Sequence, residues 1–420
     1  MQRIDALLRQ KGYRKGESMK IGIMGLTCDS GNKGCEALSY SFLSILNEIA
    51  KKNSTSYDVY SFEVASPNRT LASLSGQWPL RKKYPKTEYS NLSFRVEPYR
   101  QSIFEKLTDS AIKKCDLVFD FTAGDSFTDI YGVDRAKDRM KYKSKVLSLH
   151  VPLVLGAQTI GPFNNQEVED TAKRIIMESK EVFVRDDLSY NCVYDISGRT
   201  AVKTCDVAFA LPYNKREKKE RIVGFNPSGL LWAGGYTKDN QFQLTVDYRK
   251  YCLEVITELL KRGCEIHLIA HATNEAKTGT FSVDNDEIAC AELKSEFPEL
   301  IMEEKYITPM DAKSFISGMD FFIGARMHAT IAGVSSCVAT VPFSYSRKFE
   351  GLFDSIGYEY LIHGRGDTTE SAINKTIEYF DNRKQIEKKA AESFGVAKER
   401  LNAFISGVEQ IISDVDRERI

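Results

Sequence analysis

The chain has 420 residues, which is long for a single hydrophobic core and favours two domains. Hydrophobic residues make up 42% and charged residues 28%, a balance that excludes a disordered chain and fits a globular protein. Lys and Arg together number 58, as do Asp and Glu, so the zero net charge gives no indication of nucleic acid as a partner.

The nine cysteines and the first twenty residues indicate the cellular compartment of the protein. None of the cysteines forms a Cys-X-X-Cys pair, so we expect reduced thiols, no metal site and no redox centre. Residues 1–20 are charged throughout and lack the apolar centre of a signal peptide, and no stretch approaches the ~20 apolar residues of a spanning helix. We therefore expect a cytoplasmic protein.

The first half of the chain alternates short apolar runs with helical patterns, which is typical of a parallel α/β sheet. The clearest unit is a buried strand at Ile21–Leu26, a loop over residues 27–34 and then a helix with apolar residues at helical spacing. Further strands are predicted at Val59–Phe62, Leu117–Phe121, Leu153–Ala157 and Glu181–Val184.

The second half repeats this pattern after a charged run at Asn214–Arg221, which we interpret as a linker or a solvated edge. A helix is predicted at Tyr248–Arg262, and polar helices are predicted beyond Gly366. Strands are predicted at Ile222–Asn226, Glu265–Ile269 and Phe321–Ile323.

These elements predict two Rossmann-like parallel-sheet domains that face a central cleft. We expect an N-terminal extension (1–19), a first domain (20–212), a second domain (213–366) and C-terminal helices (367–420) that pack back across both domains. Because ligands of such sheets bind at the carboxyl ends of the strands, the chemistry should lie on the loops that follow them.

The loop before the first helix, CDSGNKGCEA, contains Gly31 and Gly34, which allow the backbone to turn and approach a ligand. It matches neither the phosphate loop GxxxxGK[ST] nor the dinucleotide motif GxGxxG. A tight turn that serves only the chain topology explains the two glycines equally well.

Polar side chains follow two further strands, in FTAGDSFTD at 121–129 and GAQTIGPF at 156–163. Asp125 and Asp129 could accept a hydrogen bond or a proton from a sugar hydroxyl, and Gln158 and Thr159 could bind a hydroxyl directly. Each of them could instead cap a helix or stabilise a turn.

Cationic side chains follow two other strands. Arg185 in VFVRDDLS ends a strand and could bind a ligand or pair with Asp186 or Asp187. Arg326 and His328 in DFFIGARMHATIAGVSS stand where a helix begins, although a core or capping histidine is the alternative.

Taken in order, these segments resemble the polysaccharide pyruvyl transferase family over about residues 20–360. The chain departs from the family at Ala123 and Asp125, where the family often has a run of glycines. The motifs that carry the resemblance are SGNKGCEAL, DLVFDFTAGDSF, LGAQTIGPF, VFVRDDLS, CDVAFAL, IGARMHATIAG and VPFSYSRKFEG.

The resemblance implies a fold like that of GT-B glycosyltransferases, phosphoenolpyruvate as the donor and a sugar of a polysaccharide or lipid-linked glycan as the acceptor. Transfer would form a cyclic pyruvate ketal, with phosphoenolpyruvate as co-substrate and no cofactor. Arg185, Arg326 and His328 match the family's donor-binding and catalytic positions, and we assign His271 and Lys348 to the donor as well. The acceptor is assigned to Asn32, Asp125, Asp129 and Gln158.

The chemistry of the donor agrees with these residue types. Two guanidiniums can grip its carboxylate and its phosphate through paired hydrogen bonds. His328 is our candidate for the acid that protonates the methylene carbon, after which a sugar hydroxyl attacks the adjacent carbon. The base that activates the hydroxyl remains open among Asp125, which our assignment favours, Asp129, His271 and Asp286.

Two other functions fit the same architecture. A nucleotide-sugar glycosyltransferase would share the fold, and a catalytically idle glycan-binding protein would need neither the acid nor the arginines. The basic run KDRMKYKSK at 137–145 could contact an anionic lipid carrier or the membrane surface, or be a solvated face.

Overall fold

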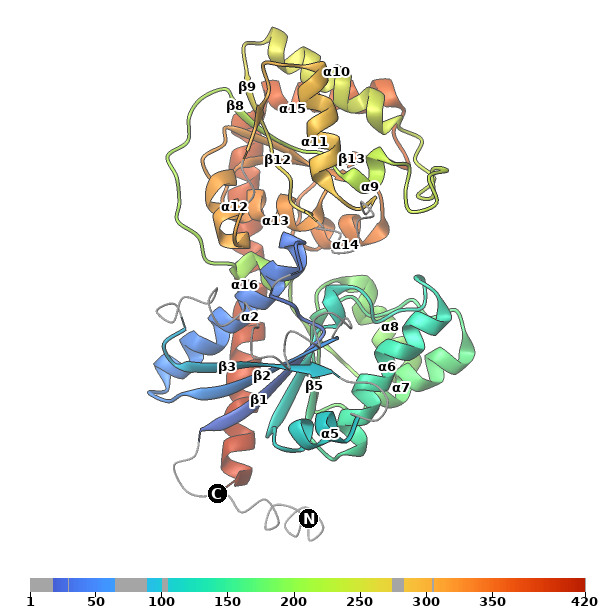
Figure 1. Cartoon of the computed structure of the whole chain (residues 1–420), viewed down its shortest axis with the longest axis vertical. Helices are drawn as coiled ribbons and strands as arrows, with labels where there is room; N and C mark the ends of the chain where they lie inside the picture. Colours follow the sequence, from blue (N-terminus) through green and yellow to red (C-terminus); the bar gives the residue numbers. More distant parts are fainter. Residues whose placement is uncertain are drawn as a thin grey trace. The chain divides into compact units, whose positions relative to one another are not determined.

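The computed structural model describes residues 18–28, 30–64, 89–99, 105–273, 283–303 and 306–419 (Figure 1). The chain divides into two compact units. The first consists of the chain up to Thr27, Phe42–Cys205 and Arg400 onward, and the second of Cys28–Ser41 and Asp206–Glu399. The division expected from the sequence is linear, whereas here the segment Cys28–Ser41 belongs to the second unit.

The first unit contains a seven-stranded sheet in the order β3-β2-β1-β4-β5-β6-β7, and every paired strand is parallel. β4 and β5 are buried along their whole length, as expected for strands covered on both faces. The strands are β1 (Met19–Met24), β2 (Tyr57–Val64), β3 (Leu92–Tyr99), β4 (Leu117–Asp120), β5 (Leu153–Gln158), β6 (Glu181–Val184) and β7 (Val202–Lys203).

Helices cover this sheet, and α6 packs on α7 and α7 on α8 (Figure 1). The last helix also belongs partly to this unit: the ring of Phe404 lies 4.9 Å from that of Phe183 and 6.4 Å from that of Phe121. The helices are α2 (Lys33–Lys52), α5 (Glu105–Lys113), the 3-10 turn η2 (Thr122–Gly124), α6 (Val133–Ser148), α7 (Gln166–Glu178), α8 (Asp187–Ser197) and α16 (Arg383–Arg419).

The second unit contains a six-stranded parallel sheet in the order β10-β9-β8-β11-β12-β13. Together the two sheets confirm the predicted pair of parallel-sheet domains. The strands are β8 (Ile222–Asn226), β9 (Glu265–Leu268), β10 (Ile301–Met302), β11 (Phe321–Gly324), β12 (Ala339–Ser344) and β13 (Ile362–His363).

The helices of the second unit pack on its sheet and on one another, with α10 against α15 and α12 against α13. Ile316, Phe322 and Ala332 belong to one apolar core between them. The elements are η3 (Val207–Ala210), α9 (Gly229–Trp232), α10 (Tyr248–Lys261), α11 (Asp286–Glu296), α12 (Pro309–Ile316), α13 (Met327–Ser335), α14 (Arg347–Ser355) and α15 (Thr369–Asp381).

The charged run at Asn214–Arg221 forms no helix or strand and lies mostly exposed within the second unit. Its backbone is nevertheless attached to α12 and the residue after it, because the amide of Asn214 donates to Ser314 Oγ at 3.0 Å and that of Arg216 to Ser317 Oγ at 2.9 Å. The run is therefore an exposed edge of the second unit, whose longer segment begins at Asp206.

Candidate functional site

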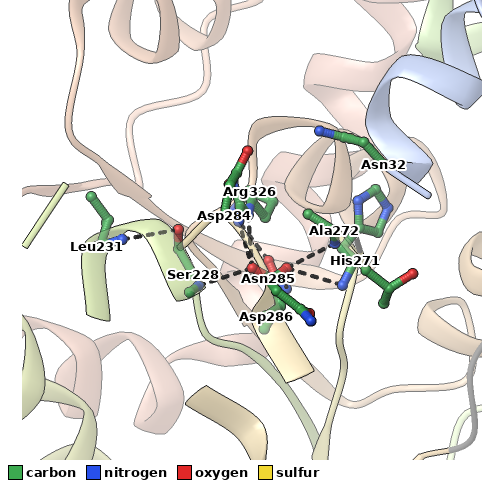
Figure 2. A network of polar contacts seen from close by, with 12 residues as sticks. Asn32, Ser228, Leu231, His271, Ala272, Asp284, Asn285, Asp286 and Arg326 are labelled. Carbon is green, nitrogen blue, oxygen red and sulfur yellow. Dashed lines mark hydrogen bonds and ion pairs between the residues drawn. The ribbon is translucent and has the colours of Figure 1, made fainter. Parts of the chain in front are cut away.

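The carboxyl ends of β8, β9 and β11 are joined by one buried carboxylate, that of Asp286 at the start of α11 (Figure 2). Its Oδ2 accepts from the amides of His271 (3.1 Å) and Ala272 (2.9 Å) and from Asn226 Nδ2 (3.3 Å). Its Oδ1 accepts from the amide of Gly229 (2.9 Å) and from Arg326. Burying a carboxylate is costly unless it is fully hydrogen-bonded, and here every contact also fixes a loop.

These contacts give Asp286 a structural role. Its side chain is fully buried, and both oxygens already accept hydrogen bonds. The structure therefore does not support the candidate assignment of Asp286 as the base that takes a proton from a sugar hydroxyl.

Arg326 lies between two carboxylates (Figure 2). Its Nε and Nη2 donate to Asp286 Oδ1 at 3.0 and 2.6 Å, and its Nη1 lies 2.6 Å from Asp284 Oδ1. Burial alone would lower the pKa of Arg326, but the two carboxylates outweigh it and raise that pKa. An anionic ligand could therefore reach the outer edge of this guanidinium only by displacing Asp284.

The loop before α2 is attached to the end of β9 in the same unit. The amide of Lys33 donates to the carbonyl of His271 at 2.9 Å, and that of Thr273 donates to the carbonyl of Gly31 at 2.8 Å. Asn32 Oδ1 accepts from the amides of Gly34 (2.9 Å) and Cys35 (3.3 Å) and so caps the helix. The predicted acceptor residue Asn32 thus has a capping role in this structure.

The charges within this loop compensate one another. Lys33 Nζ lies 2.7 Å from Glu36 Oε2, and both side chains are nearly buried. The other oxygen of Glu36 accepts from the amides of Ser30 (3.0 Å) and Gly31 (2.9 Å). The first turn of α2 is therefore held rigidly where it faces β9 and α13.

Two histidines belong to this cluster. His271 is 3% exposed, and burial lowers its pKa well below the usual value, with further lowering by His328, Arg326 and Lys33. The ring of His328 packs so closely on Gly34 that a Cβ added there would lie 2.6 Å from Nδ1. His328 Nε2 lies 3.6 Å from Asp206 Oδ2. The second unit therefore brings together Asn32, His271, Arg326 and His328, all four of which were predicted from the sequence.

In the first unit, the loop after β4 has an unusual backbone. Thr122, Ala123 and Gly124 all have positive φ angles, of 44°, 55° and 85°. The amide of Ala123 donates to the carbonyl of Gly25 at 2.6 Å. The glycines that the family often has in this loop fit such a backbone, which an alanine adopts only with strain.

A buried charge pair lies beneath this loop. Lys143 Nζ is 3.0 Å from Asp120 Oδ1, and both residues also contact the hydroxyl of Thr122. Burial lowers the pKa of Lys143, although Asp120 partly offsets this. Lys143 therefore stabilises the loop from within and belongs to no basic surface.

The other three lysines of the basic run at 137–145 also have carboxylate partners, although Lys141 is exposed. Lys137 pairs with Glu167 at 2.6 Å, Lys141 with Asp138 at 2.8 Å and Lys145 with Asp109 at 3.3 Å. Because all four lysines of this run have carboxylate partners, the predicted contact with an anionic membrane surface gains no support from it.

The predicted acceptor residues of the first unit differ in accessibility. Asp125 is partly exposed and accepts from the Tyr131 hydroxyl at 3.1 Å. Asp129 is nearly buried, and its Oδ2 accepts from the amides of Asn164 (2.6 Å) and Asn165 (2.7 Å). Gln158 is fully buried and donates to the carbonyl of Asp120 at 2.8 Å. Asp129 and Gln158 are therefore bonded to the backbone, whereas Asp125 is partly exposed, and the roles of all three in acceptor binding stay predictions.

Two predicted donor residues complete the set. Arg185 is buried at the end of β6, where its Nε donates to Thr159 Oγ1 at 2.8 Å, and Asp186 caps α8. Lys348 is half-buried in the first turn of α14. Their roles in donor binding stay predictions.

The sequence interpretation passed over Asp284, Lys33 and Glu36 as site residues and left Asp206 without a role. Asp206 stands in CDVAFAL, a motif that carries the family resemblance, so its position was available as a signal. Lys33 and Glu36 stand in the loop motif beside Asn32, but nothing in their spacing indicates a buried pair.

A family model described as polysaccharide pyruvyl transferase matches residues 32–347. The chain belongs to the polysaccharide pyruvyl transferase family. The match runs from Asn32 at the start of α2 to Arg347 at the start of α14, and it includes Arg326 and His328. This family of transferases acts in polysaccharide biosynthesis.

Solved structures support the fold at low sequence identity. A putative UDP-N-acetylglucosamine 2-epimerase from Listeria monocytogenes matches with a TM-score of 0.56 and 11% identity over 91% of this chain and 94% of its own. The UDP-GlcNAc 2-epimerase from Neisseria meningitidis, bound to UDP-GlcNAc, gives 0.54 and 12% over 94% and 99%. HepE from Anabaena, in complex with UDP-glucose, gives 0.51 and 12% over 94% and 98%.

These relatives share the GT-B fold, which confirms the predicted fold class of this pyruvyl transferase family member. The comparison with curated proteins gives no match. Within the described part of the chain, no helix combines the length and the apolar character needed to cross a bilayer.

Proposed function

We propose that this protein transfers the pyruvyl group of phosphoenolpyruvate onto two hydroxyls of one sugar, forming a cyclic ketal and releasing phosphate. The observation that carries the proposal is that Arg326 and His328 both stand at the start of α13, directly after β11, in a member of this family. Both lie at the edge of a parallel sheet where ligands bind. His271 and the first turn of α2 lie beside them.

The roles follow from the chemistry of each group. His328 donates a proton to the methylene carbon of the donor, and the adjacent carbon then bonds to the first hydroxyl oxygen. Phosphate leaves with its bonding electron pair, and the second hydroxyl closes the ring with loss of its proton. Asp125, with a partly exposed carboxylate, is our proposed base for the hydroxyl.

Arg326 and Arg185 would bind the carboxylate and the phosphate of the donor, and His271 and Lys348 would assist them. Each charge-assisted hydrogen bond contributes about 1.5–3 kcal/mol, so replacing either arginine should reduce donor use at least about tenfold. The acceptor is a sugar of a polysaccharide or a lipid-linked glycan, which a cytoplasmic enzyme would meet at the inner face of the membrane. No cofactor is part of the proposal.

The test is mass spectrometry of galactose, mannose and N-acetylmannosamine acceptors after incubation with phosphoenolpyruvate. We expect the mass gain of one pyruvyl ketal, together with phosphate release that depends on the acceptor, and loss of both in His328→Ala. His363→Ala, at a half-exposed histidine of the same unit, is the matched control and should retain activity.

Nucleotide sugars are the necessary second arm of this experiment, because structural relatives of the chain were solved with UDP-glucose and UDP-GlcNAc. If the protein transferred the sugar of UDP-glucose and did not use phosphoenolpyruvate, a glycosyltransferase function would replace our proposal. If it bound glycan and turned over neither donor, it would be a binding protein.

A further inference from the structure

The proposed acid His328 has one ring nitrogen that makes no hydrogen bond to any described residue. His328 Nε2 is buried and has no hydrogen-bond partner among the described residues. Its ion-pair contact is with Oδ2 of Asp206, at 3.6 Å. This distance is too long for a hydrogen bond but short enough for a strong interaction between charges, since Asp206 is fully buried.

The carboxylate of Asp206 is fixed by its own turn. Asp206 begins the longer segment of the second unit and caps η3, where its Oδ1 accepts from the amide of Ala208 at 2.9 Å. η3 packs against α13, the helix that carries His328. Holding Oδ1 in the cap leaves Oδ2 turned toward the imidazole.

The other charged groups near the imidazole have carboxylate partners of their own. Lys33, from α2, pairs with Glu36, and Arg326 pairs with Asp284 and Asp286. His271, from the end of β9, has its pKa lowered well below its usual value by burial and stays neutral near pH 7. Among the groups that face His328 from these elements, Asp206 is the anion placed to favour a charged imidazole.

The opposite side of the ring is equally constrained. Gly34 leaves no room for a side chain beside Nδ1, and its own amide is held by Asn32 Oδ1 at 2.9 Å. The ring is thus held between the first turn of α2 and the carboxylate before η3, and it cannot shift toward α2 without a clash.

We propose that Asp206 is the positioning residue of His328. Its carboxylate lies on the Nε2 side of the ring and favours the charged imidazolium. This proposal rests on the proposed function. In the step that it supports, an N–H bond of the imidazolium breaks, a C–H bond forms at the methylene carbon of phosphoenolpyruvate, and the imidazole becomes neutral while Asp206 stays ionised. Asp206 itself touches no substrate.

The decisive variant is Asp206→Asn in the full chain. Asparagine has nearly the same shape and is as good an N-cap as aspartate, so the turn at η3 is retained while the charge is lost. Asp206→Glu keeps the charge and serves as the second variant if the first folds poorly.

The first measurement is the ring 15N NMR spectrum of the five histidine side chains, which needs no substrate. We expect the resonance of His328 Nε2 to move in Asp206→Asn, because the charge beside this nitrogen is lost. The matched control is Glu303→Gln, which removes the carboxylate 2.6 Å from His267 and should leave the His328 resonances unchanged. An unmoved Nε2 resonance in Asp206→Asn would overturn the proposal.

The second measurement is kcat and KM for phosphate release from phosphoenolpyruvate. Because Asp206 supports the proton transfer and touches no substrate, kcat should fall in Asp206→Asn with KM unchanged, and it should return toward the wild-type value in Asp206→Glu. A moved Nε2 resonance with an unchanged kcat would overturn the role of Asp206 in the reaction. A wild-type protein that never uses phosphoenolpyruvate would refute the proposed function, and the 15N spectrum would still test the contact between Asp206 and His328.

Discussion

Gly34 and His328 are in contact across two elements that lie far apart in the sequence: a Cβ at position 34 would lie 2.6 Å from Nδ1 and 3.0 Å from Cγ of the imidazole. Position 34 is helical, so glycine is not required there by backbone geometry. A larger residue is excluded because there is no space for its side chain beside the imidazole.

Gly34→Ala should therefore reduce activity without unfolding the protein. Alanine favours the helix by about 1 kcal/mol but displaces the ring, and a shift of about 1 Å can reduce the rate on the order of 100-fold. The measurement is acceptor-dependent phosphate release together with circular dichroism. Gly395→Ala, a helical glycine with open space around it, is the matched control and should leave the rate unchanged. Wild-type activity in Gly34→Ala would show that the ring position is irrelevant.

Asp284→Asn should improve donor binding. Removing this charge frees the outer edge of the Arg326 guanidinium while Asp286 still orients the inner edge. We expect KM for phosphoenolpyruvate to fall about fivefold, which corresponds to about 1 kcal/mol. Steady-state kinetics measure this effect, and a KM that rises would mean that Asp284 orients the arginine for binding.

Asp286→Asn should destabilise the second unit. An amide cannot accept all the N–H groups that the carboxylate accepts, and breaking a buried ion pair costs about 3–5 kcal/mol. The urea unfolding midpoint measures this loss. Asp138→Asn removes an exposed pair with Lys141 and should leave the midpoint almost unchanged. Equal effects of the two variants would contradict a structural role for Asp286.

His271 should make the fold sensitive to acid. Burial lowers its pKa well below 6.5, so the unfolded chain takes up a proton that the folded chain does not as the pH falls below about 6.5. The free energy of unfolding should then fall by up to about 1.4 kcal/mol per pH unit. His271→Gln should flatten this dependence between pH 7 and 5 in urea titrations, whereas His363→Gln should not. If the free energy of unfolding of His271→Gln kept the same dependence on pH, His271 would not be the source of the acid sensitivity.

Ala123→Gly should stabilise the first unit. A left-handed alanine costs about 1–2 kcal/mol, and glycine removes that strain at a smaller cost in unfolded-state entropy. We expect a net gain of about 0.5–1 kcal/mol, seen as a higher Tm. Ala391→Gly, at an exposed helical position of α16, should have the opposite effect. A lower Tm in Ala123→Gly would mean that the methyl group makes a contact worth more than the strain.

Much of the fold follows from local sequence patterns. The predicted strands Glu181–Val184 and Ile222–Asn226 have the bounds that the structure shows, and the helix predicted at Tyr248–Arg262 ends one residue early at Lys261. β12 was not predicted. It contains Pro342, which lacks the N–H that an interior strand normally donates.

The site was predictable only in part. Residue type and position after a strand indicated Arg326 and His328, because parallel strands place their following loops at one edge. The same reasoning could not distinguish Asp125, which is partly exposed, from Asp129 and Gln158, which are buried and bonded to the backbone. Nor could local patterns show that Gly34 lies against His328, since that contact joins segments almost 300 residues apart.

The segment Cys28–Ser41 has a practical consequence for anyone who wishes to divide this protein. Neither unit is encoded by a continuous stretch of the sequence, because α2 and α16 each begin in the second unit and end in the first. A fragment that starts at Asp206 would keep His271, His328 and the buried aspartates Asp206 and Asp286. It would lose Gly34, which packs on the His328 ring, and the amide of Lys33, which donates to the carbonyl of His271. The second unit could therefore not be produced intact from one continuous segment of the chain.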